Sequence, residues 1–442
     1  MNLSKLVAKS TVVGALGGLL FGFDTAVISG ATQQLSSQFH LSPAMLGFTV
    51  ASALWGTVLG AIFAGIPGQR FGRRDSLRVM ALFYVISAVG CALAPNITSL
   101  LVFRFIGGLG IGGSSVLGPM YIAEIAPAQW RGRLVGFFQV NIVVGILLAY
   151  ISNYLLGTLH LGRAEWRWQL GISGVPALLF AAALFAIPRS PRWLAMQSRM
   201  GEAREVLTQA GVDDPEKALE EIQTSLHFES QGSEDSLWAR KYRLPVFIAV
   251  TVGMFCQLTG INAVLYYLND IFALAGASRV SSGAQAVAVG AVNLVSTLLA
   301  MSVIDKFGRR KLLLIGTVGL ALCLTAIGFL FATHTHLNWL VWLLMIYVAL
   351  FAMSHGAVVW VYISEVFPTR VRAKGQSLGS SSHWITNAVI SLVFPVLAKS
   401  SGAAPFFLFA AMMGLDLILV WRYYPETAGV SLEGMQHRLE TE

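Results

Sequence analysis

The segment YIAEIAPAQWRGR at residues 121–133 returns, in altered form, as YISEVFPTRVRAK at residues 362–374. In each copy a glutamate precedes an arginine by the same interval, Glu124 before Arg131 and Glu365 before Arg372. A second phrase, FGRR, occurs at residues 71–74 and again at 307–310, at nearly the same offset. These paired repeats predict that the chain consists of two diverged copies of one structural unit.

The composition predicts that this unit lies in lipid. Of the 442 residues, 55% are hydrophobic and only 12% are charged, which would leave a soluble domain with far too much apolar surface in water. A membrane-spanning helix needs about 20 apolar residues. Because the apolar runs are continuous and do not alternate, they predict helices and exclude a barrel. We expect twelve spans, at residues 9–32, 44–66, 75–94, 99–123, 134–157, 168–188, 244–273, 281–304, 311–333, 338–364, 376–398 and 404–424.

The spans divide evenly around one long polar stretch. The predicted fold is therefore an all-α membrane protein with two pseudo-symmetric bundles of six transmembrane helices. We place the N-terminal bundle at residues 1–188, a cytoplasmic helical linker at 189–243, the C-terminal bundle at 244–424 and a cytoplasmic tail at 425–442.

Basic residues in the loops set the expected orientation. With both termini in the cytoplasm, most of the 30 lysines and arginines fall in cytoplasmic segments, as the positive-inside rule requires. The opposite side receives only Arg163, Arg167, Arg279 and Lys399. The net charge of +8 thus reflects topology and contact with anionic lipid, and it does not indicate binding to nucleic acid.

The linker and the cysteines carry structural signals. SRMGEAREVLTQAG (198–211) predicts a helix that ends at a glycine, and DDPEKALEEIQTSL (213–226) predicts a second one with Asp214 as N-cap and Pro215 in its first turn. We expect both helices to be amphipathic and to lie on the cytoplasmic face.

Each of the three cysteines lies in an apolar span, which predicts buried thiols and no disulfide framework.

Glycines lie inside many of the spans. GGLGIGG (107–113) predicts close packing between helices. In QLTGIN (257–262) the glycine stands beside polar residues, so a local break in the helix that exposes backbone to a cavity is an alternative to packing.

Asp24 and Arg104 are charged residues within apolar spans, where charge is costly and typically functional. They lie at about 12 Å and roughly 8 Å below the predicted outer ends of their helices, close enough in depth to pair. Burial favours the protonated carboxyl and a nearby guanidinium favours the carboxylate. Movement of the arginine would therefore switch proton uptake and release, whereas a permanent ion pair would only join two helices.

Several uncharged polar residues lie in other spans. Amides offer both donors and acceptors, which suits a ligand made of hydroxyl groups, although a single amide is as readily explained by bonding between helices. Two tryptophans could present a flat apolar face to a sugar ring. The amides are Gln139, Gln257, Asn262, Asn293 and Asn387, and the tryptophans are Trp360 and Trp384.

Together these segments resemble the sugar porter family of the major facilitator superfamily, and the resemblance covers nearly the whole chain. It rests on motifs at the ends of spans and within the seventh one: IPGQRFGRR, IDKFGRR, the two opening segments, IPRSPRWL, QLTGINAVLYY and PETAGVSLE. The resemblance implies two bundles that rock around a central site, with ion pairs between the bundles stabilising the outward-open state. The residues of this predicted cytoplasmic latch are Arg73, Arg74, Glu124, Arg131, Arg309, Arg310, Glu365 and Arg372.

The resemblance also implies roles for pore residues. It assigns sugar contacts to Gln139, Gln257, Asn262, Asn293, Trp360 and Asn387, an outer gate to Tyr266 and Tyr267, and proton coupling to Asp24 and Arg104. The chain departs from the family pattern at Cys256, which stands where a second glutamine is usual, and at His383, where an amide is common. Ala352, Gln69 and Arg189 replace acidic residues of the family motifs. His383 and Trp384 complete the predicted sugar site.

We therefore expect a membrane transporter that imports a monosaccharide together with protons, without a cofactor or metal, in the plasma (inner) membrane and functional as a monomer. A passive carrier would share the fold but ignore a pH gradient. A sugar sensor would need a longer signalling tail. An enzyme would need a catalytic cluster, and the sequence offers no nucleophile and base or metal-ligand spacing that suggests one.

Overall fold

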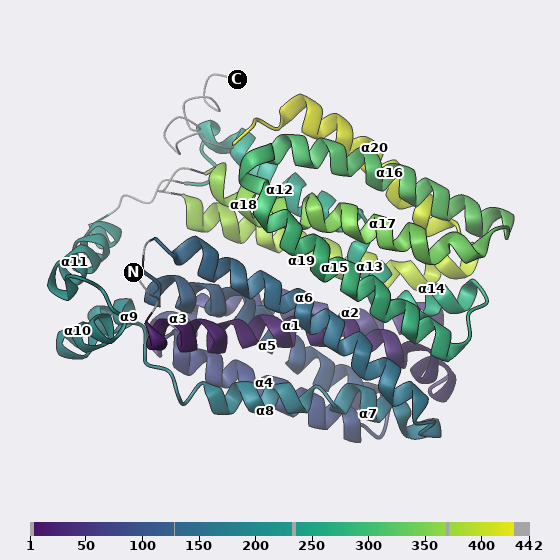
Figure 1. The fold of residues 1–442 in the computed structure, drawn as a ribbon, viewed down its shortest axis with the longest axis horizontal. Coiled ribbons are helices and arrows are strands. Elements are labelled where there is room, and N and C mark those ends of the chain that lie inside the picture. The colour runs from purple at the N-terminus through teal and green to yellow at the C-terminus, as the bar shows by residue number, and fades with distance from the viewer. Residues whose placement is uncertain (1–3, 128, 232–235, 368–370, 428–442) are drawn as a thin grey trace. The chain divides into compact units, whose positions relative to one another are not determined.

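A computed structural model describes residues 4–127, 129–231, 236–367 and 371–427 (Figure 1). The regular elements among these residues are all helices, as predicted. Eleven helical stretches in the described part are long and apolar enough to cross a membrane. The predicted sixth span is interrupted after Gly171, so it forms two shorter helices, α7 (Glu165–Gly171) and α8 (Gly174–Ala183).

The first half of the chain contains mostly long, uninterrupted helices. The fourth span starts at a capping box in which Asn96 and Ser99 bond to each other's backbone N–H, which satisfies donors that the first turn leaves free. The helices are α1 (Lys5–Gln38), α2 (Pro43–Phe63), α3 (Gly65–Arg70), α4 (Arg73–Leu93), α5 (Ile97–Ile125) and α6 (Arg131–Thr158), followed by the short η1 (Gly162–Ala164).

The linker contains α9 (Pro191–Met196), α10 (Met200–Gln209) and α11 (Pro215–Gln231). Both predicted linker helices are confirmed. Gly211, with φ of +78°, follows the end of α10, and the Asp214 carboxylate accepts a hydrogen bond from the Lys217 N–H at 3.0 Å at the start of α11. In Figure 1 these helices lie at the same end of their unit as α3.

The second half has more interruptions. Its helices are η2 (Arg240–Tyr242), α12 (Arg243–Leu258), α13 (Ile261–Tyr266), α14 (Leu268–Leu274), α15 (Arg279–Phe307), α16 (Arg309–Thr333), η3 (Leu337–Trp339), α17 (Leu340–Met353), α18 (His355–Glu365), α19 (Arg372–Ser400) and α20 (Ala404–Tyr423). The predicted seventh span is broken at Gly260 and the predicted tenth span at Ser354. Of the predicted tail, residues 428–442 lie outside the described part.

Contacts divide the chain into two compact units. Unit 1 comprises residues 1–25, 55–149 and 167–233, and unit 2 comprises 26–54, 150–166 and 234–442. The bundles predicted above were bounded by the repeat in the sequence, whereas these two units are defined by contacts between residues. Parts of α1, α2 and α6 therefore belong to unit 2.

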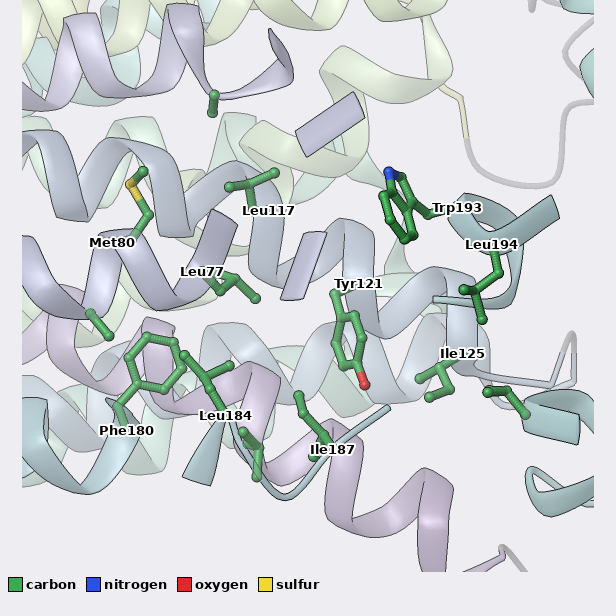
Figure 2. Close-up of a cluster of buried hydrophobic side chains, with 14 of the residues drawn as sticks. Leu77, Met80, Leu117, Tyr121, Ile125, Phe180, Leu184, Ile187, Trp193 and Leu194 are labelled. Atoms are coloured by element: carbon green, nitrogen blue, oxygen red, sulfur yellow. The ribbon is translucent and has the colours of Figure 1, made fainter. Parts of the chain in front are cut away.

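A cluster of buried side chains forms the core of unit 1 (Figure 2). Leu77 from α4, Leu117 and Tyr121 from α5, and Phe180 from α8 are all fully buried in it. The Tyr121 hydroxyl donates to the Pro188 carbonyl at 2.9 Å. This bond ties α5 to the segment that follows α8. Trp193 packs at the edge of the same cluster, so α9 is anchored to the core.

The glycine segment at residues 107–113 packs as predicted. A Cβ atom on Gly112 would lie 2.1 Å from the Thr57 carbonyl oxygen of α2, and one on Gly113 would lie 2.1 Å from the Met80 sulfur of α4. Real Cβ atoms essentially never approach below 3.0 Å, so α5 requires glycine at position 112 to lie this close to the backbone of α2, whereas the Met80 side chain beside Gly113 is flexible.

Candidate functional site

Asp24 and Arg104 face each other in unit 1, on α1 and α5. The Arg104 Nη2 lies 4.0 Å from the Asp24 Oδ2, which is the outer limit of an ion pair and longer than a hydrogen bond. The arginine side chain is 4% exposed and the aspartate 14%. Among the described residues, the Arg104 Nε has no hydrogen-bond partner. The predicted pairing is thus present as a loose contact between buried charges.

The break in the predicted seventh span lies at Thr259 and Gly260. Gly260 has φ of +85°, in the left-handed region that glycine favours, and a Cβ atom there would lie 2.3 Å from Phe409. The Tyr347 hydroxyl donates to the Thr259 carbonyl at 2.8 Å, which satisfies a backbone acceptor freed by the break. The predicted helix break is therefore present together with close packing against Phe409, and the exposure of its backbone to a cavity stays a prediction.

Gln257 is the centre of a polar chain beside this break. Asn262 Nδ2 donates to Gln257 Oε1 at 2.9 Å, so the other end of the amide, Nε2, faces His383 Nε2 at 2.8 Å. Because an amide nitrogen only donates, the ring nitrogen of His383 must accept and is unprotonated. Gln257 and His383 are 2% and 6% exposed. A neutral imidazole thus occupies the position where an amide is common.

Two tryptophans flank this histidine. The Trp360 ring of α18 lies 4.8 Å from the His383 ring, and the Trp384 ring lies 5.3 Å from it at 83°. Trp384 is buried, whereas Trp360 is 37% exposed. An indole that is partly exposed beside a polar chain could stack on the C–H face of a sugar, and this contact stays a prediction.

Asn387 contacts one of the two predicted gate tyrosines directly. Its Nδ2 donates to the Tyr266 hydroxyl at 3.1 Å, and the Tyr267 hydroxyl donates to the Ser391 carbonyl at 3.0 Å. Both tyrosines are 2% exposed. The Tyr150 hydroxyl of α6 donates to the Leu265 carbonyl at 2.9 Å, so part of α6 contacts the helix that carries Tyr266.

The other two predicted sugar contacts lie on separate helices. Asn293 is on α15 in unit 2 and is 7% exposed. Gln139 is on α6 in unit 1 and is half-buried. Their contact with sugar stays a prediction.

The first half of the predicted latch is a pair within unit 1. Arg73, the residue after Gly72, bonds to the Glu124 carboxylate at 2.9 Å through Nη2 and donates to the Gly68 carbonyl at 2.8 Å. The Ser190 hydroxyl donates to the other oxygen of Glu124. Gly72 has φ of +91°, which turns the chain so that Arg73 begins α4 facing α5.

The second half repeats this arrangement within unit 2. Arg309, after Gly308 with φ of +82°, bonds to the Glu365 carboxylate at 3.0 Å. The Thr427 hydroxyl donates to the other oxygen of Glu365 at 2.6 Å, in the role that Ser190 has in unit 1. The duplicated sequence thus folds into a duplicated ion pair. Pairing between the bundles stays a prediction.

The remaining latch residues have diverse contacts. Arg310 donates to the Trp421 carbonyl at 2.7 Å, and Arg372 donates to the Phe367 carbonyl at 3.4 Å. Arg131 is exposed at the start of α6. Arg74 donates to the Ile187 carbonyl at 3.2 Å and pairs with Asp75 at 3.0 Å.

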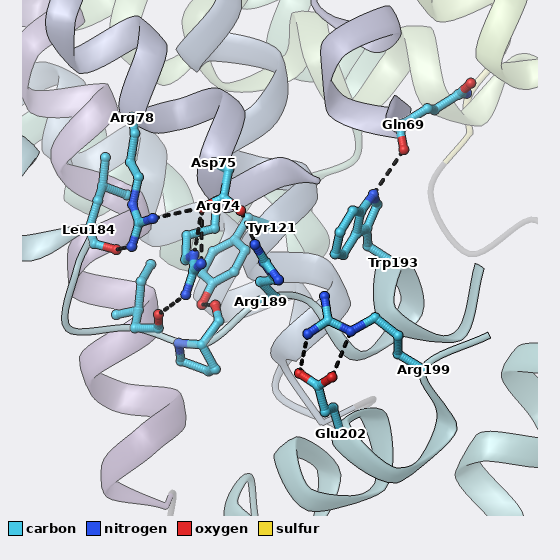
Figure 3. A network of polar contacts seen from close by, with 12 residues as sticks. Gln69, Arg74, Asp75, Arg78, Tyr121, Leu184, Arg189, Trp193, Arg199 and Glu202 are labelled. Atoms are coloured by element: carbon cyan, nitrogen blue, oxygen red, sulfur yellow. Dashed lines mark hydrogen bonds and ion pairs between the residues drawn. The ribbon is translucent and has the colours of Figure 1, made fainter. Parts of the chain in front are cut away.

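Asp75 is the centre of a network that sequence reasoning missed (Figure 3). Its carboxylate contacts Arg74, Arg78 at 2.8 Å and Arg189 at 2.9 Å. Arg189 stands where the family motif has an acidic residue, and the structure gives it this new partner. This departure from the motif thus joins the start of the linker to α4.

A buried histidine and aspartate in unit 2 also escaped prediction. His355 Nε2 lies 2.9 Å from Asp416 Oδ2, and the Thr317 hydroxyl donates to the same oxygen at 3.1 Å. His355 and Asp416 are 3% and 1% exposed. Both lie within predicted spans, so the rule that identified Asp24 would have found them.

Comparisons with known proteins agree with this architecture. A family model described as sugar (and other) transporter matches residues 10–439. The D-xylose-proton symporter of Escherichia coli is 37% identical over 478 residues, covering 99% of this chain and 97% of that protein. The arabinose-proton symporter of Bacillus subtilis is 37% identical over 429 residues, with 95% and 92% covered.

Solved structures of the xylose transporter from E. coli match the fold. The inward-open conformation has a TM-score of 0.86 at 36% identity, covering 98% of this chain and 99% of that one. The partially occluded inward-open conformation has a TM-score of 0.85 at 35% identity, covering 97% and 100%. The matches confirm the predicted major facilitator fold.

Proposed function

The chain belongs to the sugar transporter family, and from that premise we propose that it is a secondary active transporter that imports a monosaccharide together with protons by alternating access. The substrate class is a hexose or a pentose. Two relatives, named as proton symporters of D-xylose and arabinose, support this function over passive transport. The chain is not an enzyme.

The contact between Asp24 and Arg104 is the observation that carries the proposal. At 4.0 Å the two charges attract each other but share no hydrogen bond, so the carboxylate is held without being fully satisfied. A proton on Asp24 would cancel that attraction and free Arg104. A return of Arg104 toward Asp24 would favour the charged form and expel the proton.

The sugar would bind to the polar chain of unit 2. Gln257, Asn262 and Asn387 offer donors and acceptors to hydroxyl groups, and Trp360 offers an apolar face. The amide of Gln139 is proposed as a further contact. Tyr266 and Tyr267 would close the outer side after binding.

The setting of the protein follows from the same premise. We place it in the plasma (inner) membrane, in contact with lipid, with both termini in the cytoplasm as the basic loops predict. It would function as a monomer, because each chain carries a complete set of the proposed site residues.

Replacement of Asp24 by Asn tests the coupling. In proteoliposomes, we expect the wild-type protein to accumulate sugar against its gradient when the outside is acidic. The Asp24→Asn variant should lose this uphill uptake while it still exchanges internal for external sugar, because exchange needs no net proton movement. Uphill uptake by Asp24→Asn would place the coupling proton elsewhere, and wild-type uptake indifferent to pH would indicate a passive carrier.

A further inference from the structure

The contact between His355 and Asp416 lies deep within unit 2, apart from Asp24 and Arg104. His355 is the first residue of α18, Asp416 is in α20 and Thr317 is in α16, so the three side chains join three helices. A small cavity beside them is lined mainly by apolar side chains, with Cys256 and Tyr424 as its other titratable groups. The cavity lining includes no lysine or arginine. Within this lining, His355 is the side chain that can carry a positive charge opposite Asp416.

The hydrogen bonds around His355 determine how many protons it carries. The Ser354 hydroxyl donates its proton to the Leu350 carbonyl at 2.6 Å, so it can only accept from the His355 Nδ1, which lies 3.3 Å away. On the other side of the ring, Asp416 Oδ2 accepts from Thr317, and with Asp416 ionised it must also accept from Nε2, because a carboxylate has no proton to donate. Both ring nitrogens therefore act as donors, which is the pattern of an imidazolium.

The pair lies next to the break between α17 and α18. Ser354 interrupts the predicted tenth span, with φ of −121° and ψ of −95° between α17 and α18. A Cβ atom on Gly316 of α16 would lie 2.1 Å from the Ser354 hydroxyl, so the break packs directly on α16. Loss of the Nδ1 proton would leave two acceptors, Nδ1 and the serine oxygen, facing each other at this break.

We propose that His355 and Asp416 form a second proton-binding site, in which an imidazolium paired with a carboxylate fixes the break between α17 and α18. Burial favours this neutral pair over a lone carboxylate, since an uncompensated buried charge is costly. Release of the proton would weaken the contact with Ser354 and let α18 move relative to α17. The site goes beyond the coupling role of Asp24.

Histidine-selective ¹⁵N NMR of the full chain in lipid nanodiscs tests the proton count. We expect His355, assigned among the eight histidines by its loss in His355→Gln, to carry protons on both ring nitrogens near neutral pH. The Asp416→Asn variant should leave one nitrogen unprotonated. Thr317→Val is the matched control, because it removes one hydrogen bond to Asp416 and keeps both titratable groups, so its ring should remain doubly protonated. A wild-type His355 with an unprotonated nitrogen at neutral pH would overturn the proposal.

Sugar exchange at equal pH on both sides tests the consequence. Between about pH 6 and about pH 9, on either side of the ordinary histidine range, we expect the wild-type rate to change more steeply than that of Asp416→Asn. Asp24 is common to both proteins, so the comparison isolates the second site. Identical pH profiles would contradict a role in movement. If neither protein exchanges sugar, the proposed function fails, while the NMR result still decides the proton site.

Discussion

At the scale of single residues, the arrangement of Gln257 shows how one substitution changes the chemistry of a site. Its oxygen is committed to Asn262 and its nitrogen to His383. The histidine accepts with the same nitrogen that would carry a proton at low pH. A proton on this nitrogen would place two donors, the ring N–H and the Gln257 amide, against each other, which argues for Asp24 and against His383 as the carrier of the coupling proton.

Two substitutions at His383 test whether its hydrogen bond to Gln257, and not only its volume, contributes to sugar binding. His383→Leu leaves the Gln257 nitrogen without its acceptor, a loss of about 1–3 kcal/mol for a buried group. We expect sugar to bind about tenfold more weakly or worse. His383→Gln offers an amide oxygen to the same donor and should retain most of the affinity. Quenching of tryptophan fluorescence by a panel of sugars measures both, and equal affinity in the leucine variant would show that this bond does not shape the site.

At the scale of helices, two breaks within predicted spans position Gln257, Asn262 and His355. The turn at Gly260 separates Gln257 on α12 from Asn262 on α13, yet brings them within 2.9 Å. The turn at Ser354 places His355 at the start of α18. In both cases a side chain satisfies or contacts the interrupted backbone, which lets non-helical residues persist within a predicted span.

Alanine at two glycines with similar backbone angles distinguishes strain from packing. Gly260 and Gly276 have φ of +85° and +88°, so alanine costs about 1 kcal/mol at each position through backbone strain. Only at Gly260 would the new Cβ meet Phe409, whereas Gly276 has open space around it. We expect Gly260→Ala to lower the thermal unfolding temperature clearly more than Gly276→Ala. Equal shifts would mean that Phe409 moves aside freely.

At the scale of the whole molecule, unit 2 contains packing between the two predicted bundles. A Cβ atom on Gly47 of α2 would lie 2.1 Å from the Leu392 carbonyl oxygen of α19, and one on Gly30 of α1 would meet Asn153 of α6 at 2.6 Å. The first contact joins residues from opposite halves of the sequence. An alternating-access cycle would have to separate and rejoin them.

Gly47→Val should weaken this packing. With the three native cysteines replaced by alanine, a cysteine at position 32, where Thr32 is fully buried, reports access from outside. We expect a membrane-impermeant thiol reagent to label it faster in Gly47→Val, because valine cannot approach the Leu392 backbone. Gly65→Val, where the added atom meets nothing within 4 Å, is the control. An unchanged labelling rate in Gly47→Val would show that the contact between Gly47 and the Leu392 backbone does not limit access to position 32 from outside.

The sequence predicted the features that depend on pattern, and missed those that depend on contacts between distant helices. Apolar runs, glycine and the Asp214 cap predicted helices and their ends, and the repeat predicted two diverged copies of one unit. The ion pairs within each unit were not predicted, because the resemblance implied pairs between the bundles. Sequence could not reveal that Arg189 would find Asp75, because their partnership requires the linker to fold back onto α4. His355 and Asp416 are 61 residues apart and share no motif, so only folding shows that they meet.

The position of Asp24 along α1 has a further consequence. This helix continues without interruption from Lys5 to Gln38, while the division between compact units crosses it after Thr25. Asp24 therefore lies next to the point at which this helix passes from unit 1 to unit 2. A proton that binds to Asp24 would therefore change the charge of α1 beside the boundary that the helix itself bridges.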